Sequence, residues 1–254
     1  MEKVRKYLPI AFAAIELLLY SIILFFDVEH LEIYCYLTIV MAFIFSMFYL
    51  SSDKYNFICM IAFIFTLISD FFLVVNGKAE YKGIAMTSFF VVQMMYATYI
   101  YLSIENRKKL VVGLSIRLFL TIGTVIVTTV VLKTSTDYLA IISMIYFVNL
   151  FCNILDCIIN VKKMNILLVA LVLFMLCDVV TGLSVADGMY FKIAETSLLY
   201  KIIYVPFNLI WFFYVPSQVL IALNLYRKKR SEVYWFSLFC WCGGCFRHTL
   251  MPHY

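Results

Sequence analysis

Long, nearly uninterrupted apolar segments dominate this sequence and leave few folds open to it. A helix needs ~20 mostly apolar residues to cross the hydrocarbon core of a bilayer. Eight segments qualify, namely Leu8–Phe26, Leu31–Leu50, Asn56–Val75, Gly83–Ile104, Leu110–Leu132, Tyr138–Val161, Asn165–Ser184 and Ile202–Leu225. Hydrophobic residues make up 65% of the chain and charged residues only 14%, whereas a soluble domain is ~45–50% apolar. The sequence therefore predicts an all-α membrane protein with eight transmembrane helices, and it argues against nucleic-acid binding.

Basic residues lie mainly on one side of the expected membrane arrangement. Most loops between the segments are short, so neighbouring helices run antiparallel, and eight spans leave both termini on the same side. That side holds most of the Lys and Arg residues, including the runs at 107–109 and 227–230, and such loops favour the cytoplasm. We therefore expect a multi-pass protein of the plasma membrane with both termini cytoplasmic. Residues 1–230 form the expected transmembrane domain, and residues 231–254 form a cysteine-rich tail without regular structure.

A weak internal repeat relates the two halves of the chain. The segment 65–70, which ends in Asp70, parallels the segment 173–178, which ends in Asp178. Gln93 in the fourth segment parallels Gln218 in the eighth, and a basic run follows each of those segments. Four spans in each half would make the halves parallel repeats, an arrangement that also occurs in transporters.

Asp70 and Asp178 are the leading candidates for catalytic groups. Each lies about fourteen residues into its segment, or ~20 Å from the cytoplasmic end of the helix. Ionisable groups inside a membrane are rare, and they usually face the interior of the helix bundle. One carboxyl group could stay protonated as an acid while the other acts as a base. The alternative is that each is a protonated side chain that joins two helices by a hydrogen bond.

Further polar side chains share faces of the expected helices. In the sixth segment they recur every three or four residues, at Ser143, Tyr146, Asn149, Asn153, Asp156 and Asn160. Such a face either lines a wet cavity or joins helices through side-chain hydrogen bonds. The fourth segment adds Gln93 and Tyr96, and the eighth adds Asn208 and Gln218 together with two helix-bending prolines, Pro206 and Pro216. Aromatic packing is the plainer interpretation of these last two faces.

Glu16 and Arg117 lie at similar depth in the first spans of the two halves. They could form a buried ion pair, or Arg117 could extend to the cytoplasmic interface or bind phosphate. No histidine lies in any of the eight segments, which argues against a zinc hydrolase within the membrane, and we expect no metal and no cofactor. Three tail cysteines, Cys240, Cys242 and Cys245, could bind a metal, but they match no standard zinc spacing. The two other interpretations are that the tail is acylated or that it is an unstructured appendage.

Two regions resemble the lysoplasmalogenase-like (YhhN-like) family of integral membrane proteins. The first is Phe65–Leu73, followed by Gly83, Phe89, Phe90, Gln93 and Tyr96; the second is Phe174–Asp178, followed by Phe213–Ile221. The resemblance implies an eight-helix fold that covers Leu8–Arg230. It also implies cleavage of the vinyl ether bond of lysoplasmalogens into a fatty aldehyde and a glycerophospho-alcohol. Gln93 stands where many members have a histidine, and a glutamine cannot shuttle protons as histidine does.

Vinyl ether hydrolysis requires an acid that protonates carbon and a water positioned to attack. We expect Asp70 and Asp178 to supply these two functions. Side chains expected to orient the substrate or the water are Gln93, Tyr96, Gln218, Asn149, Asn153 and Asn208. The expected partners are a lysophospholipid or ether-lipid substrate and membrane lipids. Two alternatives are a small proton- or cation-coupled transporter that uses the same aspartates, and a non-catalytic lipid-binding protein.

Overall fold

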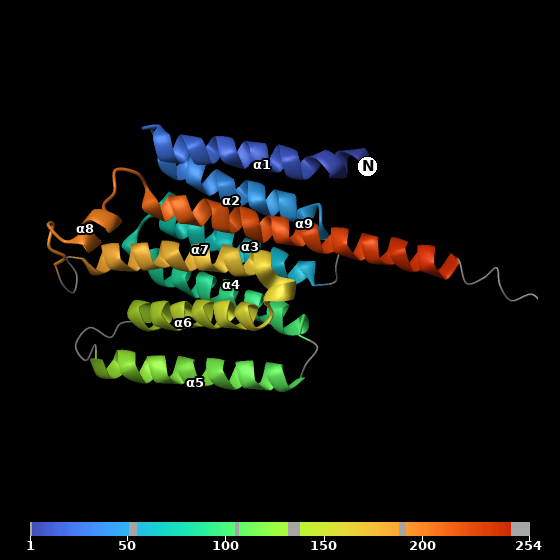
Figure 1. Cartoon of the computed structure of the whole chain (residues 1–254). Coiled ribbons are helices and arrows are strands. Elements are labelled where there is room, and N and C mark those ends of the chain that lie inside the picture. The colour runs from blue at the N-terminus through green and yellow to red at the C-terminus, as the bar shows by residue number, and fades with distance from the viewer. Residues whose placement is uncertain (1, 51–54, 105–106, 132–137, 188–191, 245–254) are drawn as a thin grey trace, which may run out of the picture.

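The computed structural model describes residues 2–50, 55–104, 107–131, 138–187 and 192–244. Within these ranges the chain is helical and contains no β-strand. The elements, in order, are α1 (Glu2–Phe25), α2 (Leu31–Met47), α3 (Asn56–Asp70), a π-helix (Phe71–Asn76), a 3₁₀ turn (Ala79–Tyr81), α4 (Lys82–Leu102), α5 (Arg107–Val131), α6 (Tyr138–Ile159), α7 (Val161–Ala186), α8 (Leu198–Ile203) and α9 (Leu209–Gly244). The long helices lie side by side as one bundle, with α1 and α5 at opposite edges (Figure 1).

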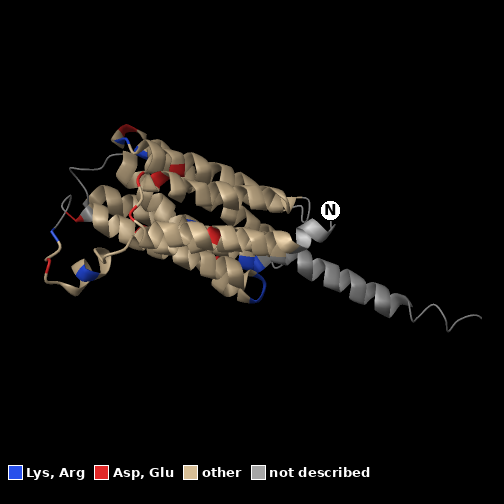
Figure 2. Cartoon of the chain, turned by 90° about the horizontal axis from the view of Figure 1, so that it is seen from above, with Lys and Arg blue, Asp and Glu red and all other residues tan. Residues whose placement is uncertain are grey.

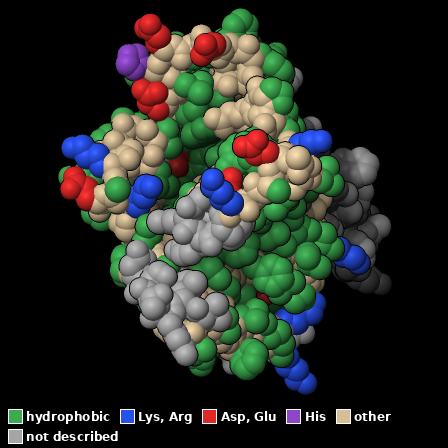
Figure 3. Space-filling model, turned by 90° about the vertical axis from the view of Figure 1, so that its left-hand side faces the viewer, with side chains coloured by type: hydrophobic (Ala, Val, Ile, Leu, Met, Phe, Trp, Pro, Cys, Tyr) green, Lys and Arg blue, Asp and Glu red, His purple; other side chains and the backbone are tan. Residues whose placement is uncertain are grey.

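Seven of the described helices are long and apolar enough to cross a membrane. Large apolar side chains on their outer faces are exposed, among them Phe119 at 75% and Ile10 at 67%. Charged side chains lie mostly at the two ends of the bundle (Figure 2). At the end that carries α8, acidic and basic side chains both lie among apolar ones (Figure 3). The chain is therefore an all-α, membrane-integral protein, as expected from its apolar segments.

The second and the last of the eight expected segments differ from the helices observed. The second, expected over Leu31–Leu50, ends as α2 at Met47 and has 17 residues. The last, expected over Ile202–Leu225, is divided into α8 and α9 around Pro206. Proline lacks an amide hydrogen and disfavours helical backbone at the preceding residue, which explains the break.

Helix α9 begins directly after Asn208 and continues beyond the expected start of the tail. Asn208 lies just before the helix, and its Oδ1 accepts a hydrogen bond from the Trp211 backbone N–H at 3.3 Å. It therefore caps the start of α9. The backbone of α9 is helical as far as Gly244, beyond Arg230 where we placed the start of the tail. Residues 245–254, including Cys245, lie outside the described residues, and a separate tail stays a prediction.

Asp187 organises the chain between α7 and α8. Its carboxylate accepts hydrogen bonds from the backbone N–H of Ile193 at 2.9 Å and from the hydroxyl of Tyr204 at 2.9 Å. The hydrogen bond to Asp187 raises the pKa of Tyr204, because loss of the phenolic proton would place a second negative charge beside the carboxylate.

The helix contacts follow a similar pattern in the two halves. In the first half α1 packs on α2, α2 on α3 and α3 on α4; in the second α5 packs on α6, α6 on α7 and α7 on α9. The halves meet through α4 against α6 and α9 against α2. This arrangement brings α3, α4, α6, α7 and α9 to the centre of the bundle, where the candidate site lies.

Candidate functional site

Asp70 is the last residue of α3, directly before the π-helix. Its side chain is only 3% exposed. The hydroxyl of Tyr214, on α9, donates a hydrogen bond to Asp70 Oδ2 at 2.6 Å. Single π-helical turns are rare and occur frequently at functional sites. A buried carboxyl group at such a turn is therefore a candidate for chemistry as well as for packing.

Asp178, on α7, is held by a tyrosine in the same way. The hydroxyl of Tyr146, on α6, donates a hydrogen bond to Asp178 Oδ2 at 2.5 Å. Unlike Asp70, Asp178 is partly exposed. The two carboxyl groups also interact electrostatically. We refer to Asp70 and Asp178 together as the aspartate pair.

Aromatic rings connect the two tyrosines behind the aspartate pair. Phe174 packs edge-on against Tyr214, with ring centroids 5.3 Å apart, and against Phe89 at 5.8 Å. Phe89 in turn contacts the ring of Tyr146 at 5.7 Å. The two aspartate–tyrosine hydrogen bonds therefore belong to one packed region built from α3, α4, α6, α7 and α9. An apolar wall of this kind limits access of water and strengthens the electrostatic interactions beside it.

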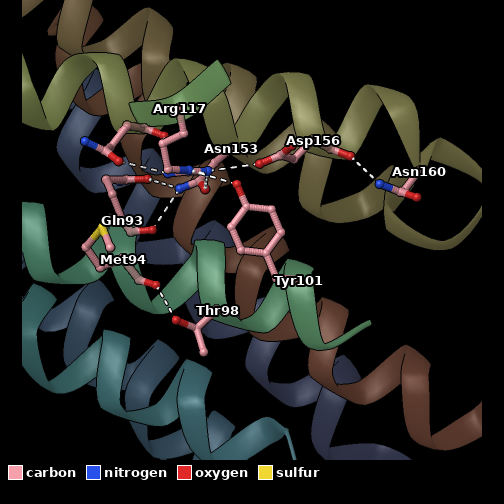
Figure 4. Close-up of polar contacts among 9 residues, drawn as sticks. Gln93, Met94, Thr98, Tyr101, Arg117, Asn153, Asp156 and Asn160 are labelled. Atoms are coloured by element: carbon pink, nitrogen blue, oxygen red, sulfur yellow. Dashed lines mark hydrogen bonds and ion pairs between the residues drawn. The ribbon is translucent and has the colours of Figure 1, made fainter. Parts of the chain in front are cut away.

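A second polar region surrounds Arg117, whose side chain points from α5 into the bundle (Figure 4). Its guanidinium donates to Tyr101 Oη at 3.0 Å, Asn149 Oδ1 at 2.9 Å and O at 3.4 Å, Asn153 Oδ1 at 2.7 Å and Asp156 Oδ2 at 3.0 Å. Asn153 Nδ2 continues the network to Gln93 Oε1 at 2.9 Å. We call Arg117, Tyr101, Asn149, Asn153, Asp156 and Gln93 the arginine cluster.

The arginine cluster explains the polar face of α6. Arg117 is only 6% exposed, and a guanidinium has five N–H donors. Five acceptor contacts take up those donors, which leaves little hydrogen-bonding capacity for a ligand. Of the two interpretations of this face, the contacts favour the one in which its side chains join helices.

Gly113 allows this close approach of α5 to α6. A Cβ atom at position 113 would lie 2.9 Å from Asp156 Oδ1 and 3.5 Å from the ring of Tyr101. The first distance is shorter than a normal van der Waals contact, so any larger residue would displace the carboxylate that pairs with Arg117.

The expected substrate-orienting residues lie in different places. Three of them, Gln93, Asn149 and Asn153, are members of the arginine cluster. Tyr96, on α4, is fully buried and interacts electrostatically with Asp70. Gln218, on α9, is 1% exposed, and neither atom of its amide has a partner among the described residues. Asn208 caps α9 as described above. Of these six residues, Tyr96 is the one for which an interaction with Asp70 is described.

Two expectations about Arg117 are wrong. It does not pair with Glu16, because its carboxylate partner is Asp156, and α1 and α5 lie at opposite edges of the bundle (Figure 1). Nor does it extend to the interface, since its donors are used inside the bundle. Equal depth in two helices does not make their side chains neighbours.

Sequence reasoning missed Tyr214 as a partner of Asp70. The signal for it was present, because Tyr214 lies four residues before Gln218 and therefore on the same face of the helix. It also missed Tyr101, which borders Arg117 both as a hydrogen-bond acceptor and through its ring, 5.4 Å from the guanidinium carbon.

Pro216, which was expected to bend the last helix, lies inside α9. A proline inside a helix removes the hydrogen bond to the carbonyl four residues earlier, which here is that of Phe212. The hydroxyl of Tyr20, on α1, donates to this carbonyl at 3.0 Å. The freed carbonyl thus joins α1 to α9.

Within the described residues, no group of three or more His, Cys, Asp or Glu side chains could hold a metal ion. The cysteines whose side chains are described are all free and buried. In comparisons with known proteins, no family model, no curated protein and no solved structure matches the chain. The functional argument therefore rests on the residues and their geometry.

Proposed function

We propose that this protein is a membrane-embedded hydrolase that cleaves the vinyl ether bond of lysoplasmalogens. The observation that carries the proposal is the aspartate pair. Two carboxyl groups from α3 and α7 interact electrostatically, each is held by a tyrosine hydroxyl, and their exposure differs. The two segments that resemble the lysoplasmalogenase-like family each end at, or contain, one of these aspartates.

The unequal exposure of the two aspartates supports a division of roles. Burial disfavours the charged form of a carboxylic acid, so the buried Asp70 is the group that stays protonated and donates a proton. Asp178 is partly exposed, which fits it better to the position next to the water. We assign Asp70 as the general acid and Asp178 as the general base.

The proposed reaction begins with a proton transferred from Asp70 to the vinyl carbon remote from the ether oxygen. This forms an oxocarbenium ion at the other vinyl carbon. Asp178 then accepts a proton from water as the water oxygen bonds to that cation, which gives a hemiacetal. The bond from the hemiacetal carbon to the glycerol oxygen then breaks. That oxygen takes the proton from Asp178 and leaves as an alcohol, while Asp70 accepts the hydroxyl proton as the fatty aldehyde forms. One water is consumed and both carboxyl groups regain their starting state.

An eight-span arrangement of two parallel repeats accommodates this site. The matching helix contacts of the two halves support it. The shorter apolar helix α2 would then cross the membrane together with the seven long ones. At 17 residues α2 is ~25 Å long, and further apolar residues, Phe48–Leu50, follow it. If the basic loops are cytoplasmic, the aspartate pair lies in the outer half of the membrane.

The direct test is aldehyde release from a lysoplasmalogen by the purified protein in detergent. Asp70→Asn and Asp178→Asn should each lower turnover by roughly 10²–10⁴-fold, which is the usual contribution of a general acid or base. Glu32→Gln is the matched control, because it makes the same carboxylate-to-amide change at an exposed side chain that is not in the aspartate pair. Wild-type turnover in either aspartate variant, or none in the parent, would reject the proposal.

A run in deuterated water sharpens the assay. Protonation of carbon predicts one deuterium on the carbon next to the aldehyde carbonyl in the product. Cleavage without that label would contradict the role of Asp70 even if turnover depended on it.

A proton-coupled transporter is the second candidate, and one observation favours it. Interacting acidic side chains inside membrane helices are typical of proton relays, and Asp178 is partly exposed. Proton flux into liposomes that depends on both aspartates, without aldehyde release, would establish this function in place of the hydrolase.

A further inference from the structure

Glu16 and Gln218 are buried polar side chains that belong neither to the aspartate pair nor to the arginine cluster. Glu16 is 2% exposed and Gln218 is 1% exposed. All four side-chain oxygen and nitrogen atoms of these two residues lack a hydrogen-bond partner among the described residues. A buried polar atom without a partner is destabilising, so two such side chains make this region a candidate for a ligand site.

Contacts of α1 show where the Glu16 side chain points. One turn before it, Phe12 stacks on Phe45 of α2 with ring centroids 4.2 Å apart. One turn after it, Tyr20 donates to the Phe212 carbonyl of α9 at 3.0 Å. Positions four residues apart lie on one face of a helix. Glu16 therefore faces the groove between α2 and α9.

Gln218 reaches the same region from α9. Val215, one turn before Gln218, packs with Cys35 of α2 and Ile23 of α1. α1 and α9 run in opposite directions (Figure 1), and Tyr20 contacts Phe212. Moving along α1 from Tyr20 back to Glu16 is therefore moving in the direction in which α9 runs from Phe212 to Gln218. The two side chains lie at about the same height in the bundle, within roughly one helical turn.

The second half of the molecule shows what such a position holds when its polar groups are satisfied. There Gly113 approaches Asp156 as Phe12 approaches Phe45 in the first half. One turn further along the helix pair, Arg117 meets Asn153, and Asn153 meets Gln93.

In the second half, Arg117 lies four residues after Gly113, and Asn153 lies three residues before Asp156. The same offsets from Phe12 and Phe45 in the first half give Glu16 and Ala42. Ala42 is fully buried and has no polar side chain, so it cannot connect Glu16 to Gln218 as Asn153 connects Arg117 to Gln93. The carboxylate of Glu16 thus takes the position that the guanidinium of Arg117 has in the second half. Ala42 takes the position of the bridging Asn153.

We propose that Glu16 and Gln218 form a binding site for a small monovalent cation between α1, α2 and α9. The carboxylate supplies the negative charge and Gln218 Oε1 supplies a second oxygen ligand. Hard cations prefer oxygen ligands of these kinds, and the single negative charge of Glu16 balances a monovalent rather than a divalent cation. A sodium or potassium ion and the primary ammonium of a lipid headgroup share this chemistry. The site does not depend on the hydrolase proposal.

Thermal unfolding of the full chain in detergent tests the site. The protein is titrated with NaCl, KCl or ethanolammonium chloride, with N-methylglucamine chloride holding the ionic strength constant. Above its Kd a bound cation should raise the unfolding temperature by roughly 3–6 °C for each tenfold increase in concentration. An effect of Na⁺ or K⁺ assigns an inorganic ion, and an effect of ethanolammonium alone assigns a headgroup.

Two variants separate the site from a general salt effect. Glu16→Gln keeps the side-chain shape but removes the charge, and it should abolish the cation-dependent rise. Ala42→Asn leaves Glu16 in place and supplies the bridging amide that Asn153 supplies in the other half, so it should also abolish the rise while it stabilises the cation-free protein. Glu32→Gln, at the exposed start of α2, should respond as the wild type does.

The proposal is overturned if none of the three cations raises the unfolding temperature of the wild type, or if the rise persists in Ala42→Asn or Glu16→Gln. Should Glu16→Gln fail to fold, Ala42→Asn decides the outcome, because it retains the carboxylate.

Discussion

The arginine cluster and the aspartate pair both place ionisable side chains inside helices suited to span a membrane, but they hold them differently. Arg117 has an acceptor for each of its donors, including the carboxylate of Asp156. Asp70 and Asp178 each have one tyrosine, and each other, in a region where Asp178 is partly exposed. Fully satisfied charges resist ligands, whereas incompletely satisfied ones are available for chemistry. The comparison supports a structural role for the first region and the proposed reaction at the second.

Removing the guanidinium gives the largest expected effect on stability. Arg117→Met leaves Asp156 buried without its ion-pair partner and four further acceptor contacts unmade. Loss of one partner of a buried ion pair costs about 3–5 kcal/mol, so we expect a clearly lower unfolding temperature and a smaller folded fraction in detergent. Turnover per folded molecule should stay near the parent value. An equally stable Arg117→Met protein would remove the structural half of the comparison.

A smaller effect is expected where α5 approaches α6. Gly113→Ala inserts a methyl group 2.9 Å from Asp156 Oδ1, and overpacking of this kind costs about 1–3 kcal/mol. Gly123→Ala, on the same helix, is the matched control, since a Cβ there meets nothing within 4 Å. Unfolding curves of the two variants should differ, with only the first destabilised; equal curves would show that the close approach is not required.

The smallest effect should come from the proline in α9. Tyr20→Phe removes the donor to the Phe212 carbonyl that Pro216 leaves without its helical partner. A hydrogen bond of this type contributes about 0.5–1.5 kcal/mol. The variant should therefore unfold slightly earlier than the parent and release aldehyde at the parent rate. A large loss of turnover would instead connect α1 to the reaction.

The helices were largely predictable from the sequence, because segments of ~20 apolar residues leave the backbone no other way to satisfy its hydrogen bonds in lipid. Prediction was weaker where proline intervenes. Pro206 divides the expected last segment into α8 and α9, while Pro216 lies inside α9 and is accommodated by Tyr20. Nothing in the local sequence distinguishes the two, since the difference depends on a neighbouring helix.

Site residues were predicted as faces of single helices but not as contacts between helices. The periodicity of α6 placed Asn149, Asn153 and Asp156 on one face, and all three are buried there. It did not reveal that their partner is Arg117 rather than the aspartates, because a helical pattern contains no information on which helix lies opposite. The ion pair expected between Glu16 and Arg117 failed for the same reason.

The most direct test of the central claim changes one carboxylate to an amide in each region. Asp178→Asn and Asp156→Asn are compared for aldehyde release per folded molecule and for unfolding temperature. We predict that Asp178→Asn unfolds near the parent temperature but loses roughly 10²–10⁴-fold in turnover. Asp156→Asn leaves Arg117 without its counter-charge, so its free energy of unfolding should fall by about 3–5 kcal/mol and its unfolding temperature should be lower. Its turnover per folded molecule should be retained. The opposite result, with turnover lost in Asp156→Asn and retained in Asp178→Asn, would contradict the division between a structural cluster and a reactive pair.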